Sequence, residues 1–106
     1  MGEQYISKFE KPSPYEREIL TIMQEECAEI IVQISKALRF GLDDGYPGGN
    51  ETNRQAIGRE LGDLDVITEL AKQNGLFSGV ARVAAHDGKR RKLARFMQTH
   101  PEDARS

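Results

Sequence analysis

The sequence predicts an all-α protein, a bundle of three or four helices per chain, from three observations. Three long stretches contain no residue that would force a helix to end, and the residue before each stretch is one that commonly caps a helix. Apolar residues in the first two stretches recur every three to four positions, as on one face of a helix. No stretch alternates convincingly between apolar and polar residues, as a half-buried strand would.

The first helix is expected over 14–40. Ser13 is a good N-cap residue, Pro14 suits the first helical position and Glu16 adds a negative charge to the first turn. No residue in this stretch breaks a helix until Gly41, a common residue just beyond a helix end.

A loop rich in glycine, residues 41–52, separates this helix from a second one. Thr52 or Asn53 can cap the second helix, which should run to about Asn74 and stop at Gly75.

Two glycines interrupt the expected second helix. Gly58 and Gly62 each cost roughly 1 kcal/mol relative to alanine in a helix interior. Either close helix packing or a group bound nearby would account for them.

A third helix is expected from the cap residue Ser78 to about Gln98, with a weak point at 86–88. The sequence thus divides into an N-terminal arm, one helical domain and a C-terminal tail. These segments are residues 1–13, 14–100 and 101–106.

The composition fits one modest domain of 106 residues and excludes several classes of protein. A single cysteine, Cys27, excludes a disulfide framework and a cysteine-built zinc site, and its place on the apolar arc predicts a core residue. No apolar run approaches the ~18 residues of a membrane span and no signal peptide is evident, so we expect a cytoplasmic protein without a membrane segment.

The net charge of −2 argues against nucleic-acid binding by bulk charge, but the charges are distributed unevenly along the chain. Residues 1–75 carry 8 basic and 14 acidic side chains, whereas residues 76–106 carry 7 basic and 3 acidic ones. Such a distribution suits either a basic nucleic-acid arm or one site that needs both signs, such as metal carboxylates opposite phosphate-binding lysines.

Acidic residues interrupt the apolar faces of the first two helices. On a helical wheel, Glu26 lies inside the apolar arc of the first helix, Glu29 lies at its edge and Glu25 lies outside. Glu60 falls in the middle of the apolar arc of the second helix, and Asp63 also falls within it. A charged residue on a core face is normally a fault unless it is functional.

Packing of the two apolar faces would bring four carboxylates together. Uncompensated, they would be very costly, so they must take up protons, recruit basic partners or bind a cation. Ligation by oxygen alone suits Mg²⁺ or Mn²⁺. One acidic pair alone would more commonly be a solvated helix face.

Residues 25–29 (EECAE) and 60–63 (ELGD) resemble the paired motif Glu-Glu-x-x-Glu and Glu-x-x-Asp of the MazG-like all-α nucleoside triphosphate pyrophosphohydrolases, which are related to the dimeric dUTPases. The resemblance extends over roughly residues 18–95. It implies Mg²⁺-dependent hydrolysis of a nucleoside triphosphate to the monophosphate and pyrophosphate. It also implies a four-helix core built within a homodimer or homotetramer.

Carried over by position, the resemblance makes Glu26, Glu29, Glu60 and Asp63 the metal ligands. Glu25 or Glu29 would accept the proton of the attacking water as the catalytic carboxylate.

The resemblance also implies a basic motif on the third helix. Lys89 and Lys92 are the candidates for binding the substrate phosphates, and they could face the bundle while their neighbours face water. A solvated basic face is the other interpretation.

The acidic motifs are separated by 30 residues, which is long for this family, and the excess lies in the loop 41–52. Phe40 directly precedes this loop, and Tyr46 lies within it. Stacking on a nucleobase and ordinary packing are both open roles for these two rings.

Two other functions remain open. The chain could be a non-enzymatic helical interaction protein whose acidic cluster pairs with lysines of a partner. It could also be a small nucleic-acid-binding module that uses the basic segment 82–95, although no motif that reads a groove accompanies it.

Overall fold

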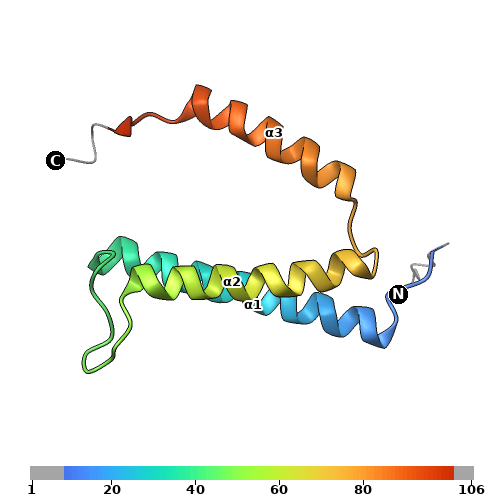
Figure 1. Ribbon diagram of the computed structural model, residues 1–106, viewed down its shortest axis with the longest axis horizontal. Coiled ribbons are helices and arrows are strands. Elements are labelled where there is room, and N and C mark those ends of the chain that lie inside the picture. The colour runs from blue at the N-terminus through green and yellow to red at the C-terminus, as the bar shows by residue number, and fades with distance from the viewer. Residues whose placement is uncertain (1–8, 102–106) are drawn as a thin grey trace, which may run out of the picture. The chain divides into compact units, whose positions relative to one another are not determined.

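The computed structural model describes residues 9–101 and confirms an all-α fold. Its three helices are α1 (Pro14–Phe40), α2 (Asn53–Gln73) and α3 (Gly79–Phe96) (Figure 1). The described part of the chain has no strand, and its only β-type pairing is an isolated bridge between Gly45 and Thr52. Most of the predicted arm (residues 1–8) and tail (residues 102–106) lies outside the described residues.

Helix α1 has the bounds predicted from the sequence. The Ser13 hydroxyl accepts a hydrogen bond from the Glu16 backbone N–H (3.2 Å), and the Glu16 carboxylate accepts one from the Ser13 N–H (2.9 Å). This reciprocal pair satisfies two of the free N–H groups at the helix start. Gly41 ends the helix with a φ of 103°, a conformation that a residue with a Cβ rarely adopts.

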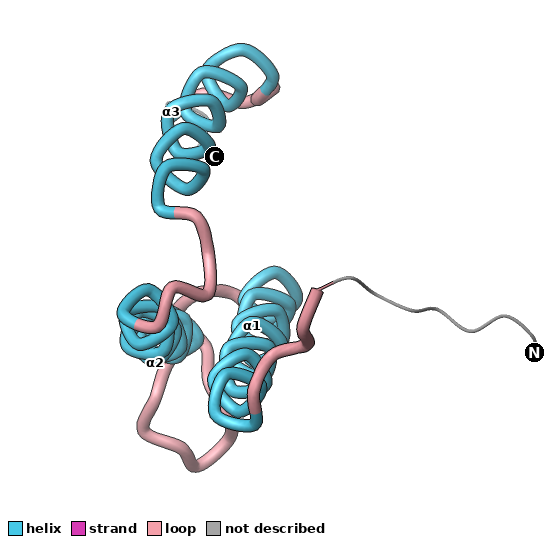
Figure 2. The backbone as a smooth tube through the Cα atoms, turned by 90° about the vertical axis from the view of Figure 1, so that its right-hand side faces the viewer, coloured by secondary structure: helices cyan, strands magenta, loops and turns pink. Residues whose placement is uncertain are grey.

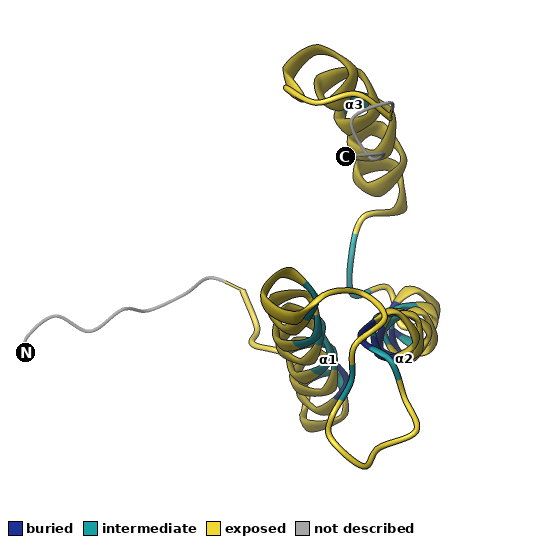
Figure 3. Ribbon diagram, turned by 90° about the vertical axis from the view of Figure 1, so that its left-hand side faces the viewer, coloured by how far each residue is buried: buried dark blue, intermediate teal, exposed yellow. Residues whose placement is uncertain are grey.

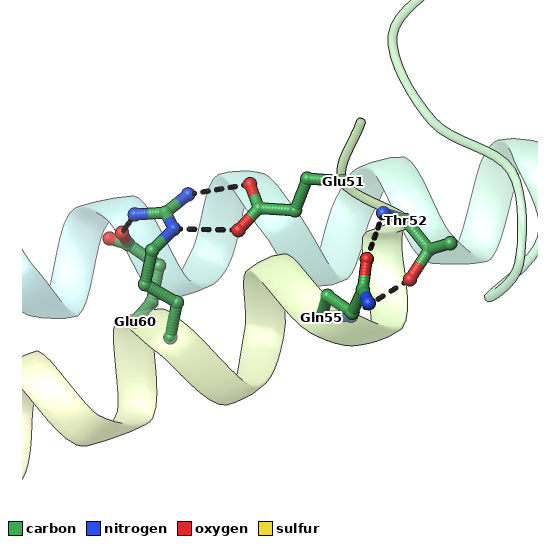
Figure 4. Close-up of polar contacts among 5 residues, drawn as sticks. Glu51, Thr52, Gln55 and Glu60 are labelled. Carbon is green, nitrogen blue, oxygen red and sulfur yellow. Dashed lines mark hydrogen bonds and ion pairs between the residues drawn. The ribbon is translucent and has the colours of Figure 1, made fainter. Parts of the chain in front are cut away.

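Helix α2 is capped by Thr52, the first of its two candidates. Thr52 and Gln55 exchange side-chain to backbone hydrogen bonds of 2.9 and 3.1 Å (Figure 4). Asn53 instead is buried, and its side-chain amide donates to the Gly41 carbonyl (2.9 Å). This bond ties the end of α1 to the start of α2 and fixes the two ends of the loop between them.

Helix α3 begins after the predicted cap, because the Ser78 hydroxyl accepts a hydrogen bond from the Ala81 N–H (3.0 Å). The helix continues through residues 86–88, where the sequence predicts a weak point, and ends at Phe96, two residues before the predicted end. A glycine in a helix costs only about 1 kcal/mol, which local hydrogen bonding can outweigh.

The chain divides into two compact units, residues 1–76 and 77–106. In the first unit α1 and α2 lie side by side as a helical hairpin, closed by the loop 41–52 (Figures 1 and 2). The second unit contains α3, on which every side chain from Val80 to Phe96 is at least partly exposed. The hairpin holds the acidic motifs and therefore the candidate site.

The core of the hairpin lies along the facing sides of α1 and α2 (Figure 3). Its buried apolar residues are Ile19, Ala56, Ile67 and Ala71. Other residues of the predicted apolar arcs stay exposed, among them Ile34, Leu38 and Leu61. The expectation that Cys27 is a core residue is also wrong, because a hairpin of two helices buries only one side of each and Cys27 is exposed.

At Gly45 the loop between α1 and α2 leaves no room for a side chain. A Cβ on Gly45 would lie 2.3 Å from the Glu51 carbonyl oxygen, closer than real contacts allow. In contrast, a Cβ on Gly58 or Gly62 would meet no atom within 4 Å, so close packing of α1 against α2 within the described hairpin does not explain these two residues.

We therefore expect opposite effects from two alanine substitutions. Gly45→Ala should lower the free energy of unfolding by roughly 1–3 kcal/mol, because the loop backbone must move. Gly58→Ala, the matched control, should raise it by up to about 1 kcal/mol through helix propensity. Urea unfolding followed by circular dichroism measures both, and equal effects of one sign would contradict the loop geometry.

Candidate metal centre

Three carboxylates from the two motifs converge between α1 and α2. Glu26 comes from α1, and Glu60 and Asp63 come from successive turns of α2. One oxygen of each lies within 4.8 Å of the other two. An ion with bonds of about 2.1 Å spaces its ligand oxygens by up to about 4.2 Å, so small rotations of these side chains would allow all three to bind one cation.

Burial makes this cluster unlike a solvated acidic face. Glu60 is only 2% exposed and Glu26 is half-buried, whereas Asp63 is exposed. The Oε2 atoms of Glu26 and Glu60 are both buried and have no hydrogen-bond donor within the described part of the chain. Two such oxygens are costly to bury, and a cation between them would remove that cost.

Glu29 lies next to the cluster and is exposed to water. A hydrogen bond with Glu60, and repulsion from the Glu60 and Glu26 charges, raise the pKa of Glu29 to about 7. Burial, and then the nearby charges of Asp63 and Glu60, also raise the pKa of Glu26. Without a metal, Glu29 therefore holds a proton at pH values where isolated carboxylates are ionised, and the pKa of Glu26 is shifted in the same direction.

One cation of the chain itself contacts the cluster. The Arg59 guanidinium donates a hydrogen bond to Glu60 Oε1, and it grips Glu51 through two bonds of 2.8 and 3.0 Å. Figure 4 shows Glu51 and Glu60 joined through this group. The paired Glu51 raises the pKa of Arg59, and Arg59 lowers the pKa of Glu51. The loop 41–52 is thus fastened to a carboxylate of the cluster.

Arg59 and Glu51 were not predicted from the sequence as residues of the site. Neighbouring residues of a helix do not face each other, so the Arg59–Glu60 pair follows no helical spacing rule. The Arg59 guanidinium contacts Glu60 through Nη1 while its Nε and Nη2 hold Glu51 of the loop. The only signal in the sequence was a basic residue beside a carboxylate on an apolar face.

The remaining candidates are not among the three converging carboxylates. Glu25 is exposed, and it lines a shallow hollow formed by the first turns of α1 rather than the cluster. Lys89 and Lys92 lie on α3, in the other unit, with exposed side chains. Contact of these lysines with the cluster, and a catalytic role of Glu25, stay predictions.

None of the helices in the described part of the chain combines the length and apolar character that a membrane crossing needs. Comparison of the sequence and structure with protein-family models, with curated proteins and with solved structures gives no match. The functional argument therefore depends on the geometry of the hairpin and on the two acidic motifs.

Proposed function

We propose that the protein is a Mg²⁺-dependent nucleoside triphosphate pyrophosphohydrolase, which converts a ribo- or deoxyribonucleoside triphosphate to its monophosphate and pyrophosphate. One observation carries the proposal. Glu26, Glu60 and Asp63 bring one oxygen each within 4.8 Å of the others, and Glu26 and Glu60 each have a buried oxygen without a hydrogen-bond donor among the described residues. The two acidic motifs resemble those of MazG-like enzymes and supply the reaction class.

The donor set indicates the kind of cation. All candidate ligand atoms are carboxylate oxygens, and the described residues near them include no histidine or thiol ligand. Hard oxygen ligands suit Mg²⁺ or Mn²⁺, whereas zinc and copper favour nitrogen and sulfur. Glu26, Glu60 and Asp63 would hold the ion, and Glu29 is close enough to Glu60 to join them. A bound Mg²⁺ would supply positive charge to phosphate oxygens and lower the pKa of water.

Glu29, which lies outside the group of Glu26, Glu60 and Asp63, would also act as the general base. Glu29 is exposed to water and close enough to Glu60 for the two carboxylates to share a proton. Once that proton is lost, the ionised Glu29 carboxylate would accept a proton from a water molecule next to the cluster. The water oxygen forms a bond to the α-phosphorus, and the bond from this phosphorus to the bridging oxygen breaks. Pyrophosphate leaves with that oxygen. Lys89 and Lys92 would neutralise the leaving group.

We also infer that the protein works as a homodimer or homotetramer. A single hairpin buries few apolar side chains, and Leu38 remains 83% exposed, with Ile31 and Val66 also largely exposed. Exposed apolar surface on so small a unit favours self-association. Light scattering coupled to gel filtration would give a mass of two or four times 11.9 kDa.

The first experiment measures product formation from a panel of ribo- and deoxyribonucleoside triphosphates, with Mg²⁺ and with EDTA. Phosphorus NMR should show pyrophosphate rather than phosphate, and a reaction in ¹⁸O-labelled water should place the label in the monophosphate. Asp63→Asn should remove the activity, whereas Asp65→Asn, an equally exposed change two residues further along α2, should retain it.

A folded wild-type protein that releases no pyrophosphate from any nucleotide would contradict the proposal. Binding of a basic protein partner without metal would then favour the helical interaction protein. Salt-sensitive binding of DNA or RNA through residues 82–95 would favour the nucleic-acid module.

A further inference from the structure

A cavity adjoins the metal centre on the side of the loop 41–52. Its volume is about 670 Å³, which is in the range of small-molecule sites. The C-terminal half of α1, the loop and the first turns of α2 line it. Glu51 and Arg59, the pair that reaches Glu60, belong to its lining, so the cavity and the cluster share a wall.

The face of α1 that carries the acidic motif continues into this cavity. Gln33, Lys36 and Phe40 line it, and they follow Glu29 by four, seven and eleven residues. These spacings keep all three on the side of α1 that carries Glu29. The rise along the helix from Glu29 to Lys36 is about 10 Å. A ligand anchored at the cluster can therefore extend along α1 into the cavity.

Two aromatic rings of the cavity are largely exposed within this chain, although the Arg39 guanidinium lies over the Phe40 ring, 4.9 Å from its centroid. Tyr46 is 82% exposed and Phe40 is 56% exposed. The sequence left packing and base stacking open for these rings, and this degree of exposure argues against packing. Aromatic rings that are open to solvent beside a concave surface suit a planar aromatic ligand. Stacking would shield the touching faces of the ring and the ligand from water.

The polar groups of the cavity suit the edge of such a ligand. The side-chain amides of Gln33 and Asn50 line the cavity, and among the described residues neither takes part in a side-chain hydrogen bond. An amide both donates and accepts, as the edge of a nucleobase requires. Lys36 adds a positive charge between the rings and the carboxylates.

From this arrangement we propose that the cavity binds the base and sugar of the nucleoside triphosphate whose phosphates lie at the metal centre. The inference rests on the proposed function. It makes the substrate a nucleotide rather than inorganic polyphosphate, with Tyr46 as the ring that stacks on the base. It also assigns the loop 41–52 to substrate recognition.

The experiment compares two probes by calorimetry in the presence of Mg²⁺. One probe is a set of α,β-imido analogues of purine and pyrimidine nucleoside triphosphates, and the other is inorganic tripolyphosphate. Tyr46→Ala should weaken binding of the best analogue by roughly 5- to 100-fold, the range of one lost base stack. Tyr46→Phe should restore most of that affinity, and tripolyphosphate binding should be the same in all three proteins.

Tyr15→Ala is the matched control, because Tyr15 is an exposed tyrosine at the start of α1 that does not line the cavity. The inference is overturned if no analogue binds more tightly than tripolyphosphate, or if Tyr46→Ala and Tyr15→Ala behave alike. Binding requires no turnover, so the two proposals can fail separately. Analogue binding that depends on Tyr46, in a protein that hydrolyses no nucleotide, would keep the cavity assignment and reject the proposed reaction.

Discussion

Glu60→Gln is expected to reduce Mg²⁺-dependent pyrophosphate release by more than about 100-fold, since loss of a residue that only supports a metal ligand already costs 10- to 100-fold. The amide keeps the size of the side chain but removes its charge. Glu60 is the most buried carboxylate of the cluster, and one of its oxygens lies within 4.8 Å of an oxygen of Glu26 and of Asp63. Its Oε2 is buried and has no hydrogen-bond donor among the described residues. Its neutral replacement should also weaken Mn²⁺ binding, measured by titration calorimetry.

The same substitution should leave the metal-free protein folded and as stable as the wild type, or more stable. Removing one negative charge relieves repulsion on Glu26 and Glu29, whose pKa values Glu60 helps to raise. Arg59 keeps both of its bonds to Glu51. A structural role for Glu60 predicts the reverse, a clear loss of stability from disturbing a buried ion pair.

Glu69→Gln is a suitable control, because Glu69 is an exposed carboxylate on α2 outside the cluster. It should change neither activity nor Mn²⁺ affinity. A fully active Glu60→Gln protein would refute the metal assignment. Thermal unfolding of both variants, with and without Mn²⁺, separates loss of the ligand from loss of the fold.

The sequence was sufficient to predict the helices and the position of the acidic cluster. Ser13, Thr52 and Ser78 are caps whose chemistry is local, so the helix starts follow from a few neighbouring residues. Glu60 was found because a helical period is a strong constraint, and one charge in the middle of an apolar arc has to be buried when that face packs.

The parts that the sequence did not predict depend on contacts between elements. The Arg59–Glu51 pair needs the path of the loop, which no periodicity describes. Cys27 and Leu38 belong to the apolar arc of α1 but stay exposed, because the wheel shows which residues share a face and not how much of that face a partner covers. The cavity is likewise a product of the loop and both helices.

The second large effect is a pH dependence of metal binding. Glu29 has its pKa raised from 4.5 to about 7 by the Glu60 hydrogen bond and the surrounding carboxylates. A metal ion that joins the cluster must displace this proton. The apparent Mn²⁺ affinity should therefore fall as the pH falls, by about tenfold between pH 8 and pH 6 for one proton displaced. Titration calorimetry in buffers of different ionisation enthalpy would count the protons released.

The raised pKa of Glu29 gives the stability of the metal-free protein the opposite pH dependence, because this stability falls as the pH rises. Because the folded state holds its proton more tightly than the unfolded chain, the stability that Glu29 contributes is complete below pH 4.5 and is lost as the pH rises through about 7. Mn²⁺ should therefore raise the melting temperature far more at pH 8 than at pH 6. In Glu29→Gln most of this pH dependence should disappear, because the shared proton is gone. An unchanged dependence in that variant would mean that another group carries the proton, and Glu29 would then lose its place beside the metal.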